Sequence, residues 1–275
     1  MLRGDDIYMK RLLLTGVLAL LLSLNCLTNA FAGNTIIRED LGKFFTGYEG
    51  TFVLYDEIND QYTIYNEQQS NARLSPCSTF KIYNSLIALE SGVVDKEDVF
   101  TLIKWDGTQY PFPAWNRDQT LSSAMSNSVV WYYQELARRV GVEKMQYFID
   151  QLHYGNQDIS GGIDHFWLRS SLTISAKEQV ELLKQLYNGT LPFTAENMAI
   201  VRKIIVLSAD NNLTFSGKTG SGYQDGQYIL GWFVGSLEKD GHKYYFATNI
   251  VNNQAADGGK AREITKLILK DLGLL

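Results

Sequence analysis

Histidine and cysteine are both scarce in this sequence. Three histidines (His153, His165 and His242) and two cysteines (Cys26 and Cys77) occur among its 275 residues. The histidines show no His-x-His or His-Glu-x-x-His spacing and the cysteines form no close pair, so the sequence predicts no metal site. No histidine follows a Gly-x-Ser-x-Gly motif, which argues against a Ser-His-Asp hydrolase.

Basic residues are also fewer than acidic residues. Lys and Arg number 25 against 30 Asp and Glu, which gives a formal charge of −5. An acidic chain has no electrostatic footprint for a phosphate backbone, so nucleic acid is not expected as a partner. With 45% hydrophobic and 20% charged residues, the composition is that of a folded globular chain. No internal repeat or low-complexity linker divides it, and one large domain is expected.

Long hydrophobic runs are limited to one, residues 12–24. Lys10 and Arg11 precede it and Ala30-Phe31-Ala32 follows, which predicts a signal peptide over 1–32, cleaved after Ala32, and a single catalytic domain over 33–275. We therefore expect an exported protein, periplasmic or secreted, with no membrane attachment after cleavage. A retained anchor and a lipoprotein at Cys26 are the alternatives. Cleavage leaves Cys77 alone, so no internal disulfide is expected.

Strand-like and helix-like patterns occupy different parts of the chain. Runs rich in β-branched and aromatic residues predict strands near both ends, over 50–56, 61–66, 213–219, 228–237 and 243–251. Helical periodicity predicts helices over 79–92, 121–140, 142–152, 176–187, 195–207 and 260–272. The expected fold is α/β (α+β), an antiparallel sheet formed from both chain ends and flanked by helices. A mixed lobe (33–84 and 207–275) would carry an inserted helical lobe (85–206), with the site in the cleft between them.

Three short motifs carry side chains suited to nucleophilic chemistry. Ser78 and Lys81 are three residues apart at a predicted helix start, where the lysine can reach the hydroxyl and helix amides favour an oxyanion. Ser128 falls at a predicted lobe boundary, and Lys218-Thr219-Gly220 ends a predicted strand. Each motif alone also has a plain structural interpretation, as a helix cap or a turn.

Taken in order, the motifs resemble those of the penicillin-recognising serine enzymes, and more narrowly the class D, oxacillinase-type serine β-lactamases. The matching motifs, which extend the resemblance over residues 50–272, are Ser-x-x-Lys at 78–81, Ser-x-Val at 128–130, Tyr-Gly-Asn at 154–156, Phe-Trp-Leu at 166–168 and Lys-Thr-Gly at 218–220. The resemblance implies the serine β-lactamase and transpeptidase fold.

The resemblance also implies roles for five catalytic residues. Ser78 would be the nucleophile and Lys81 the general base, modified by CO2 to N6-carboxylysine. Only an unprotonated amine reacts with CO2, so this lysine needs an apolar pocket that lowers its pKa. Trp167 would hold the carbamate by its indole N–H. Ser128 would relay a proton to the lactam nitrogen, and Lys218 would supply positive charge.

Further residues would bind the substrate. The resemblance implies an oxyanion hole made by the backbone N–H groups of Ser78 and Ser221. Its substrate-binding set comprises Thr219, Gly220, Arg262, Val130, Trp115 and Leu168. Arg262 would bind the substrate carboxylate, although a surface helix arginine is the alternative.

The implied activity is hydrolysis of penicillin-type β-lactams, which confers antibiotic resistance. The expected partner is a small β-lactam molecule, no cofactor is expected beyond CO2 or bicarbonate, and the chain would be a monomer or a homodimer. A non-hydrolytic β-lactam sensor domain and a D,D-peptidase of cell-wall synthesis are the alternatives. The sensors are tethered by several membrane helices, and the peptidases do not account for Ser-x-Val together with Phe-Trp-Leu.

Overall fold

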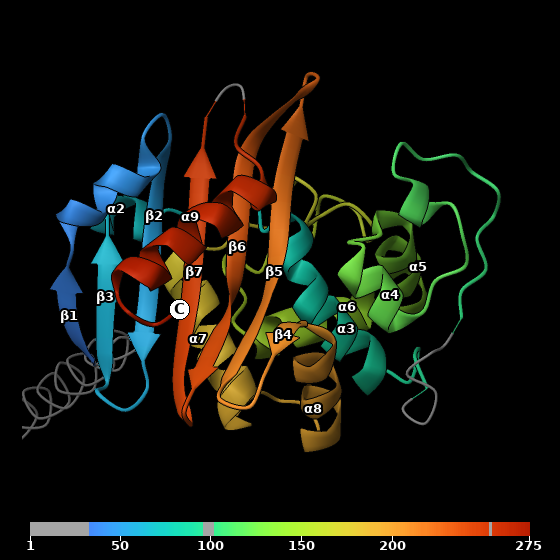
Figure 1. The fold of residues 1–275 in the computed structure, drawn as a ribbon. Coiled ribbons are helices and arrows are strands. Elements are labelled where there is room, and N and C mark those ends of the chain that lie inside the picture. Colours follow the sequence, from blue (N-terminus) through green and yellow to red (C-terminus); the bar gives the residue numbers. More distant parts are fainter. Residues whose placement is uncertain (1–32, 96–101, 253–254) are drawn as a thin grey trace, which may run out of the picture. The chain divides into compact units, whose positions relative to one another are not determined.

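Residues from the two ends of the chain form one sheet in the computed structural model, which describes residues 33–95, 102–252 and 255–275. Within these residues the sheet has seven strands in the order β1-β3-β2-β7-β6-β5-β4 (Figure 1). The strands are β1 (Asn34–Ile37), β2 (Glu49–Asp56), β3 (Gln61–Tyr65), β4 (Val206–Ala209), β5 (Leu213–Gln224), β6 (Gln227–Lys239) and β7 (His242–Val251). The antiparallel pair β2–β7, with Val53 opposite Ala247, joins the two ends.

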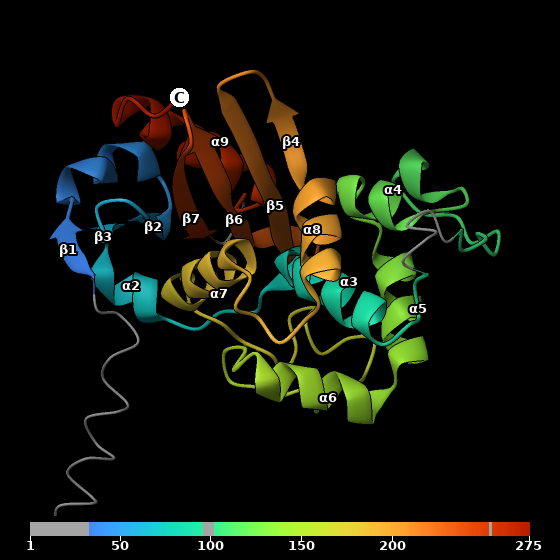
Figure 2. The same ribbon diagram turned by 90° about the horizontal axis from the view of Figure 1, so that it is seen from below.

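Helices cover both faces of this sheet. Helix α9 (Gly258–Asp271) and the 3-10 helix η2 (Glu39–Phe45) pack on one face over a buried cluster that includes Phe52, Phe246 and Ile268. Helix α7 (Ala176–Asn188) packs on the other face (Figure 2). Alternating side chains of one strand point to opposite faces, so the strands supply both hydrophobic clusters.

The remaining helices lie on the α7 side of the sheet and surround one buried helix. Helix α3 (Lys81–Glu90) follows the 3-10 helix η3 (Cys77–Phe80), and every residue from Lys81 to Leu89 is buried. A helix that is buried all round belongs in a core, and α3 contacts α5 and α8. The other elements are α2 (Glu67–Asn71), η4 (Pro113–Trp115), α4 (Leu121–Ser126), α5 (Val130–Val140), α6 (Val142–Gln151) and α8 (Ala195–Ile204).

The structure confirms the predicted fold class, with differences in detail. The single helix predicted over 121–140 is wrong: α4 and α5 are separate because Ser128 has a left-handed φ of 54°. The helix predicted over 195–207 ends at Ile204, since Val206 pairs with Ser216 in the sheet as part of β4. The strand β1 and the short helices η2, α2 and η4 had no sequence prediction.

The predicted signal peptide, residues 1–32, lies outside the described residues. Residues Thr35–Leu275 form one compact unit, and the boundaries of the two lobes stay a prediction. Among the described residues, no helix has both the length and the apolar character needed to cross a bilayer.

Candidate active site

The Ser78 turn is held against the sheet at the start of the central helix. The Thr79 backbone N–H and hydroxyl both donate to the Pro76 carbonyl, at 3.1 and 2.8 Å, and the Lys81 N–H donates to the Ser78 carbonyl. In a 3-10 helix, residues three apart lie one above the other. This geometry explains why the Ser78 and Lys81 side chains share a face.

Lys81 is completely buried beside that serine. Its Nζ lies 2.7 Å from Ser78 Oγ, 3.5 Å from Ser128 Oγ and 5.5 Å from the centre of the Tyr133 ring. Burial lowers the pKa of Lys81 well below its ordinary value, and the charge of Lys218 lowers it further. Both effects favour the neutral amine of Lys81, the form that can act as a base toward the serine proton.

Lys218 reaches the same group of side chains from strand β5. Its Nζ donates to Ser128 Oγ at 2.9 Å and to the Thr219 carbonyl at 3.0 Å. Burial lowers the pKa of Lys218 to about 7, and the positive charge of Arg262 contributes to that shift. Ser128 therefore links two lysines whose pKa values are both lowered, that of Lys218 to about 7.

A cavity of about 780 Å³ opens beside Ser78 and Ser128. Four of the other residues predicted for the site line it, namely Val130, Thr219, Ser221 and Trp115. Much of its remaining wall is aromatic and consists of Phe112, Tyr223 and Tyr228. Hydroxyl groups and aromatic rings thus share the lining of one cavity, which suits a ligand with a polar core and an apolar substituent.

Gly220 allows strand β5 to approach the Ser78 turn. A Cβ at this position would lie 2.9 Å from the Pro76 carbonyl oxygen and 3.3 Å from the Ser78 nitrogen. The first distance is shorter than real Cβ contacts, so only glycine fits without a shift of the backbone. This close approach brings the strand that carries Lys218 and Ser221 to the nucleophile candidate.

Arg262 and Leu168 lie away from the Ser78 cavity as far as the described residues define it. Arg262 lines a smaller cavity of about 100 Å³, which also includes Lys218 and shares Thr219 with the larger one. Leu168 packs on the main hydrophobic cluster. Their predicted contacts with a substrate stay predictions.

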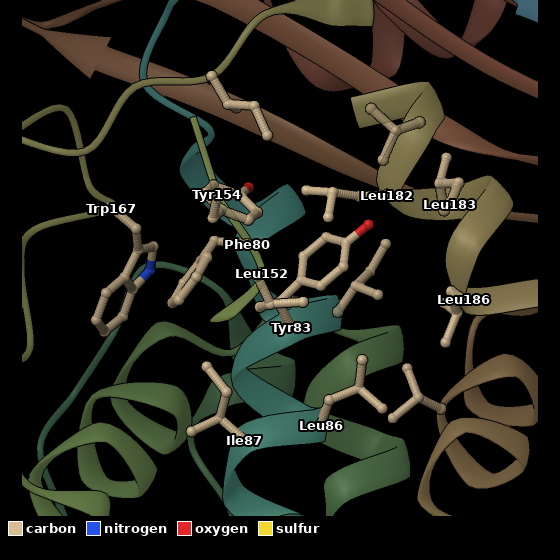
Figure 3. Close-up of a cluster of buried hydrophobic side chains, with 14 of the residues drawn as sticks. Phe80, Tyr83, Leu86, Ile87, Leu152, Tyr154, Trp167, Leu182, Leu183 and Leu186 are labelled. Carbon is tan, nitrogen blue, oxygen red and sulfur yellow. The ribbon is translucent and has the colours of Figure 1, made fainter. Parts of the chain in front are cut away.

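Trp167 lies in the same core as the ring of Phe80. Their ring centres are 5.6 Å apart, and Figure 3 shows the indole next to the Phe80 ring. The indole Nε1 of Trp167 is buried and, within the residues that the structure describes, has no hydrogen-bond acceptor. Because buried donors are nearly always satisfied, this donor points to a missing acceptor.

Three aromatic residues of the site had no prediction from the sequence. Tyr133 lies one helical turn after Val130, and this spacing of three could have placed it on the same face. Tyr223 and Tyr228 flank the β5–β6 turn, and their position depends on the hairpin register, which no local pattern defines. Cys77 is buried, and desolvation raises the pKa of its thiol to about 11.

Comparison with known proteins identifies the family. A family model described as "Penicillin binding protein transpeptidase domain" matches residues 50–270. The "Probable beta-lactamase YbxI" of Bacillus subtilis (strain 168) is 45% identical over 231 residues, which cover 84% of each chain. The "Regulatory protein BlaR1" of Bacillus licheniformis is 40% identical over 249 residues, which are 90% of this chain but 41% of that protein.

A solved structure agrees with the sequence relatives. "Class D beta-lactamase BAT-2" superposes with a TM-score of 0.81 at 43% identity, over 86% of this chain and 96% of that one. Both the matched domain and this level of identity extend over most of the chain. The chain therefore belongs to the family of the penicillin-binding protein transpeptidase domain and, within it, to the class D serine β-lactamases.

Proposed function

We propose that the protein hydrolyses the β-lactam ring of penicillin-type antibiotics through an acyl-enzyme at Ser78, with Lys81 in its N-carboxylated form, and so confers antibiotic resistance. The observation that carries this proposal is the buried Lys81, whose Nζ lies 2.7 Å from Ser78 Oγ. Its lowered pKa supports a neutral amine, the only form that reacts with CO2.

The surroundings of Lys81 fit a carboxyl group on its nitrogen. The Trp167 indole N–H is a buried donor without an acceptor among the described residues, and a carboxylate near it would supply one. When present, the carboxyl group would supply an anionic oxygen that can take up a proton beside Ser78. Lys81 and Trp167 would hold it, in a pocket whose apolar sides we assign to Val130 and Leu168.

The chain's own residues account for acylation and release. Ser78 Oγ attacks the lactam carbonyl carbon while its proton leaves toward Lys81. Ser128, with its Oγ 2.9 Å from Lys218 Nζ, is suited to deliver a proton to the lactam nitrogen as the carbon–nitrogen bond breaks. A water molecule that loses its proton on the Lys81 side then attacks the ester carbon and frees Ser78.

Charge and shape would orient the substrate. The backbone N–H groups of Ser78 and Ser221 would stabilise the oxyanion, at the place where Gly220 allows close approach. Lys218, Thr219 and Arg262 would bind the carboxylate that penicillins carry. A planar guanidinium suits bidentate binding of a carboxylate better than an ammonium does.

A second candidate function is that of a β-lactam sensor, which is acylated at Ser78 but does not release the product. It is favoured by the 40% identity to BlaR1, of which this chain spans about two fifths. Both functions require the same nucleophile. They differ in the lifetime of the acyl group.

The experiment that separates them follows Ser78 by intact mass. Purified residues 33–275 would receive a chromogenic cephalosporin, with and without bicarbonate, and Ser78→Ala would serve as the unreactive control. The hydrolase is expected to turn over many equivalents, faster with bicarbonate, and to return to its unmodified mass. A stable one-to-one adduct without turnover would contradict the hydrolase and favour the sensor.

Export is part of the same proposal. Cleavage after Ala32 would give a mature chain that begins at Gly33. N-terminal sequencing of protein recovered from outside the cytoplasm tests this directly, and a chain that still carries residues before Gly33 would contradict it.

A further inference from the structure

We propose that Ser75 is a positioning residue that holds the Trp167 segment against the turn carrying Ser78. Its hydroxyl donates to the Trp167 carbonyl at 3.0 Å and accepts from the Arg169 backbone N–H at 2.8 Å. One hydroxyl thus binds the backbone on both sides of Leu168. This proposal rests on the proposed function, because the effect of Ser75 is measured through the carboxylation of Lys81.

Ser75 is itself anchored to the sheet. The indole Nε1 of Trp232, a fully buried residue of β6, donates to the Ser75 carbonyl at 2.9 Å. Ser75 also directly precedes the turn that Thr79 closes onto the Pro76 carbonyl, three residues before Ser78. The sheet, the nucleophile turn and the Trp167 segment therefore meet at one residue.

The segment needs such a restraint because its backbone is strained. Arg169 has a left-handed φ of 56°, a backbone conformation that carries a steric cost for a non-glycine residue. The hydrogen bond from its N–H to Ser75 offsets part of this cost. Without the hydroxyl, the Arg169 N–H and the Trp167 carbonyl both lose a partner, and the segment can relax away from the turn.

A small shift of this segment would matter at Lys81. Trp167 packs on Phe80, the residue directly before Lys81, with ring centres 5.6 Å apart (Figure 3). A hydrogen bond weakens steeply outside a narrow range of distance and angle. The indole N–H can therefore serve a carboxyl group on Lys81 only while its backbone is held in place.

The surroundings of Ser75 permit a clean pair of variants. Ser75 lines an outer cavity of about 750 Å³ that also includes Arg73, Arg169 and Leu230, so open volume lies beside its side chain. Ser75→Ala removes the hydroxyl and adds no bulk. Ser75→Thr keeps the hydroxyl, and the cavity leaves room for its extra methyl group.

The test uses the full chain and a readout other than activity. Wild type, S75A and S75T would be titrated with ¹³C-labelled bicarbonate at constant pH, and the carbamate signal followed by ¹³C NMR. Ser70→Ala is the matched control, because buried Ser70 donates to the Glu67 carbonyl at 2.7 Å on the remote helix α2. The bicarbonate concentration for half-maximal hydrolysis would be measured on the same samples.

S75A is expected to need about tenfold more bicarbonate for the half-maximal carbamate signal, the equivalent of one lost hydrogen bond. S75T and S70A are expected to stay close to wild type. Trp232→Phe keeps the Ser75 hydroxyl but removes the donor to its carbonyl. It is expected to raise the bicarbonate requirement about threefold, which corresponds to part of the energy of one hydrogen bond. This variant gives a second measurement should S75A fold poorly.

The outcomes separate this proposal from the proposed function. If the carbamate signals of S75A and W232F respond to bicarbonate in the same way as the signal of the wild type, the positioning role of Ser75 is overturned. Absence of any carbamate signal in the wild type would instead contradict a carboxylated Lys81, and the role of Ser75 would fall with it.

Discussion

Lys81 and Lys218 share one hydroxyl, since Ser128 Oγ lies 3.5 Å from Lys81 Nζ and 2.9 Å from Lys218 Nζ. Burial lowers the pKa of both lysines, and the charge of Lys218 lowers that of Lys81 further. Two ammonium groups in one buried site repel each other. The arrangement therefore favours the neutral amine at Lys81 and leaves Lys218 as the positive charge below about pH 7.

Removal of the Lys81 amine should stop the release of the acyl group. Lys81→Ala is expected to lower the deacylation rate by about 10²–10⁴-fold, the usual contribution of a general base. Intact mass should then show Ser78 trapped as an adduct, and circular dichroism should show an unchanged fold. Lys43→Ala, at an exposed residue paired with Asp271, is the control. Wild-type turnover in Lys81→Ala would contradict the proposed base.

The burial of Lys218 should make folding stability depend on pH. Its pKa is about 7 in the folded protein and 10.5 as the ordinary value, so between these values the unfolded chain binds the extra proton. Burial of the charged Lys218 therefore lowers the free energy of unfolding by its full amount below about pH 7, and this effect disappears above pH 10.5. Lys218→Met is expected to raise the free energy of unfolding by about 1–3 kcal/mol at pH 6 and by less at pH 9.

The same variant should lose activity while it gains stability. Without the ammonium, kcat/KM for a carboxylate-bearing β-lactam should fall, and the wild-type value should decline as pH rises through about 7. Urea unfolding at two pH values and a pH–rate profile are the two measurements. An equal stability gain at both pH values would show that the lysine is not neutral when buried.

The reactive side chains of the site could be predicted from the sequence, but only part of their arrangement in space could. Ser78 and Lys81 could be predicted as neighbours because helical spacing determines their distance. The left-handed Ser128 could not, since residues 121–140 were predicted as one helix and the break within it depends on tertiary packing. The position of Arg262 beside the smaller cavity likewise depends on how α9 packs across the sheet.

The fold could likewise be predicted from the sequence only in part. The pairing of both chain ends followed from the type of each segment, because strands at the two ends must share a sheet to bury their faces. Strand β4 was missed because its four residues are all exposed and follow directly on helix α8. Its strand conformation depends on pairing with β5, and no local sequence pattern shows this pairing.

A side chain at Gly220 should separate the strand from the nucleophile turn. Gly220→Ala would place a Cβ 2.9 Å from the Pro76 carbonyl oxygen, so the backbone must shift. We expect a loss of about 1–3 kcal/mol in unfolding free energy and a larger relative loss in the rate of acylation, because the Ser78 and Ser221 amides separate. Urea unfolding and stopped-flow acylation measure the two effects.

Gly42→Ala is the matched control for that variant. Its added Cβ, in the 3-10 helix η2, would first meet the Tyr65 side chain, at 3.2 Å. It is expected to leave the acylation rate unchanged. A Gly220→Ala protein that acylates as fast as wild type would show that the close approach of β5 is unnecessary for the reaction.

Trp167→Phe should affect activity more than stability. Phenylalanine keeps a ring against Phe80 and Phe166 but removes an indole N–H that has no acceptor among the described residues. Loss of an unsatisfied buried donor offsets part of the packing lost with the larger ring, so the unfolding free energy should change little. The bicarbonate needed for half-maximal activity should rise about tenfold, because a carboxylated Lys81 loses its donor.

Trp105→Phe is the control for the indole. Trp105 Nε1 donates to the Thr108 carbonyl at 2.7 Å in an exposed loop, so its loss should leave the bicarbonate requirement unchanged. If Trp167 only packed in the core, Trp167→Phe would lower stability without any change in that requirement. A donor buried without an acceptor is unfavourable in a structural core, so a rise in bicarbonate dependence without a loss of stability would identify the indole N–H as part of the site.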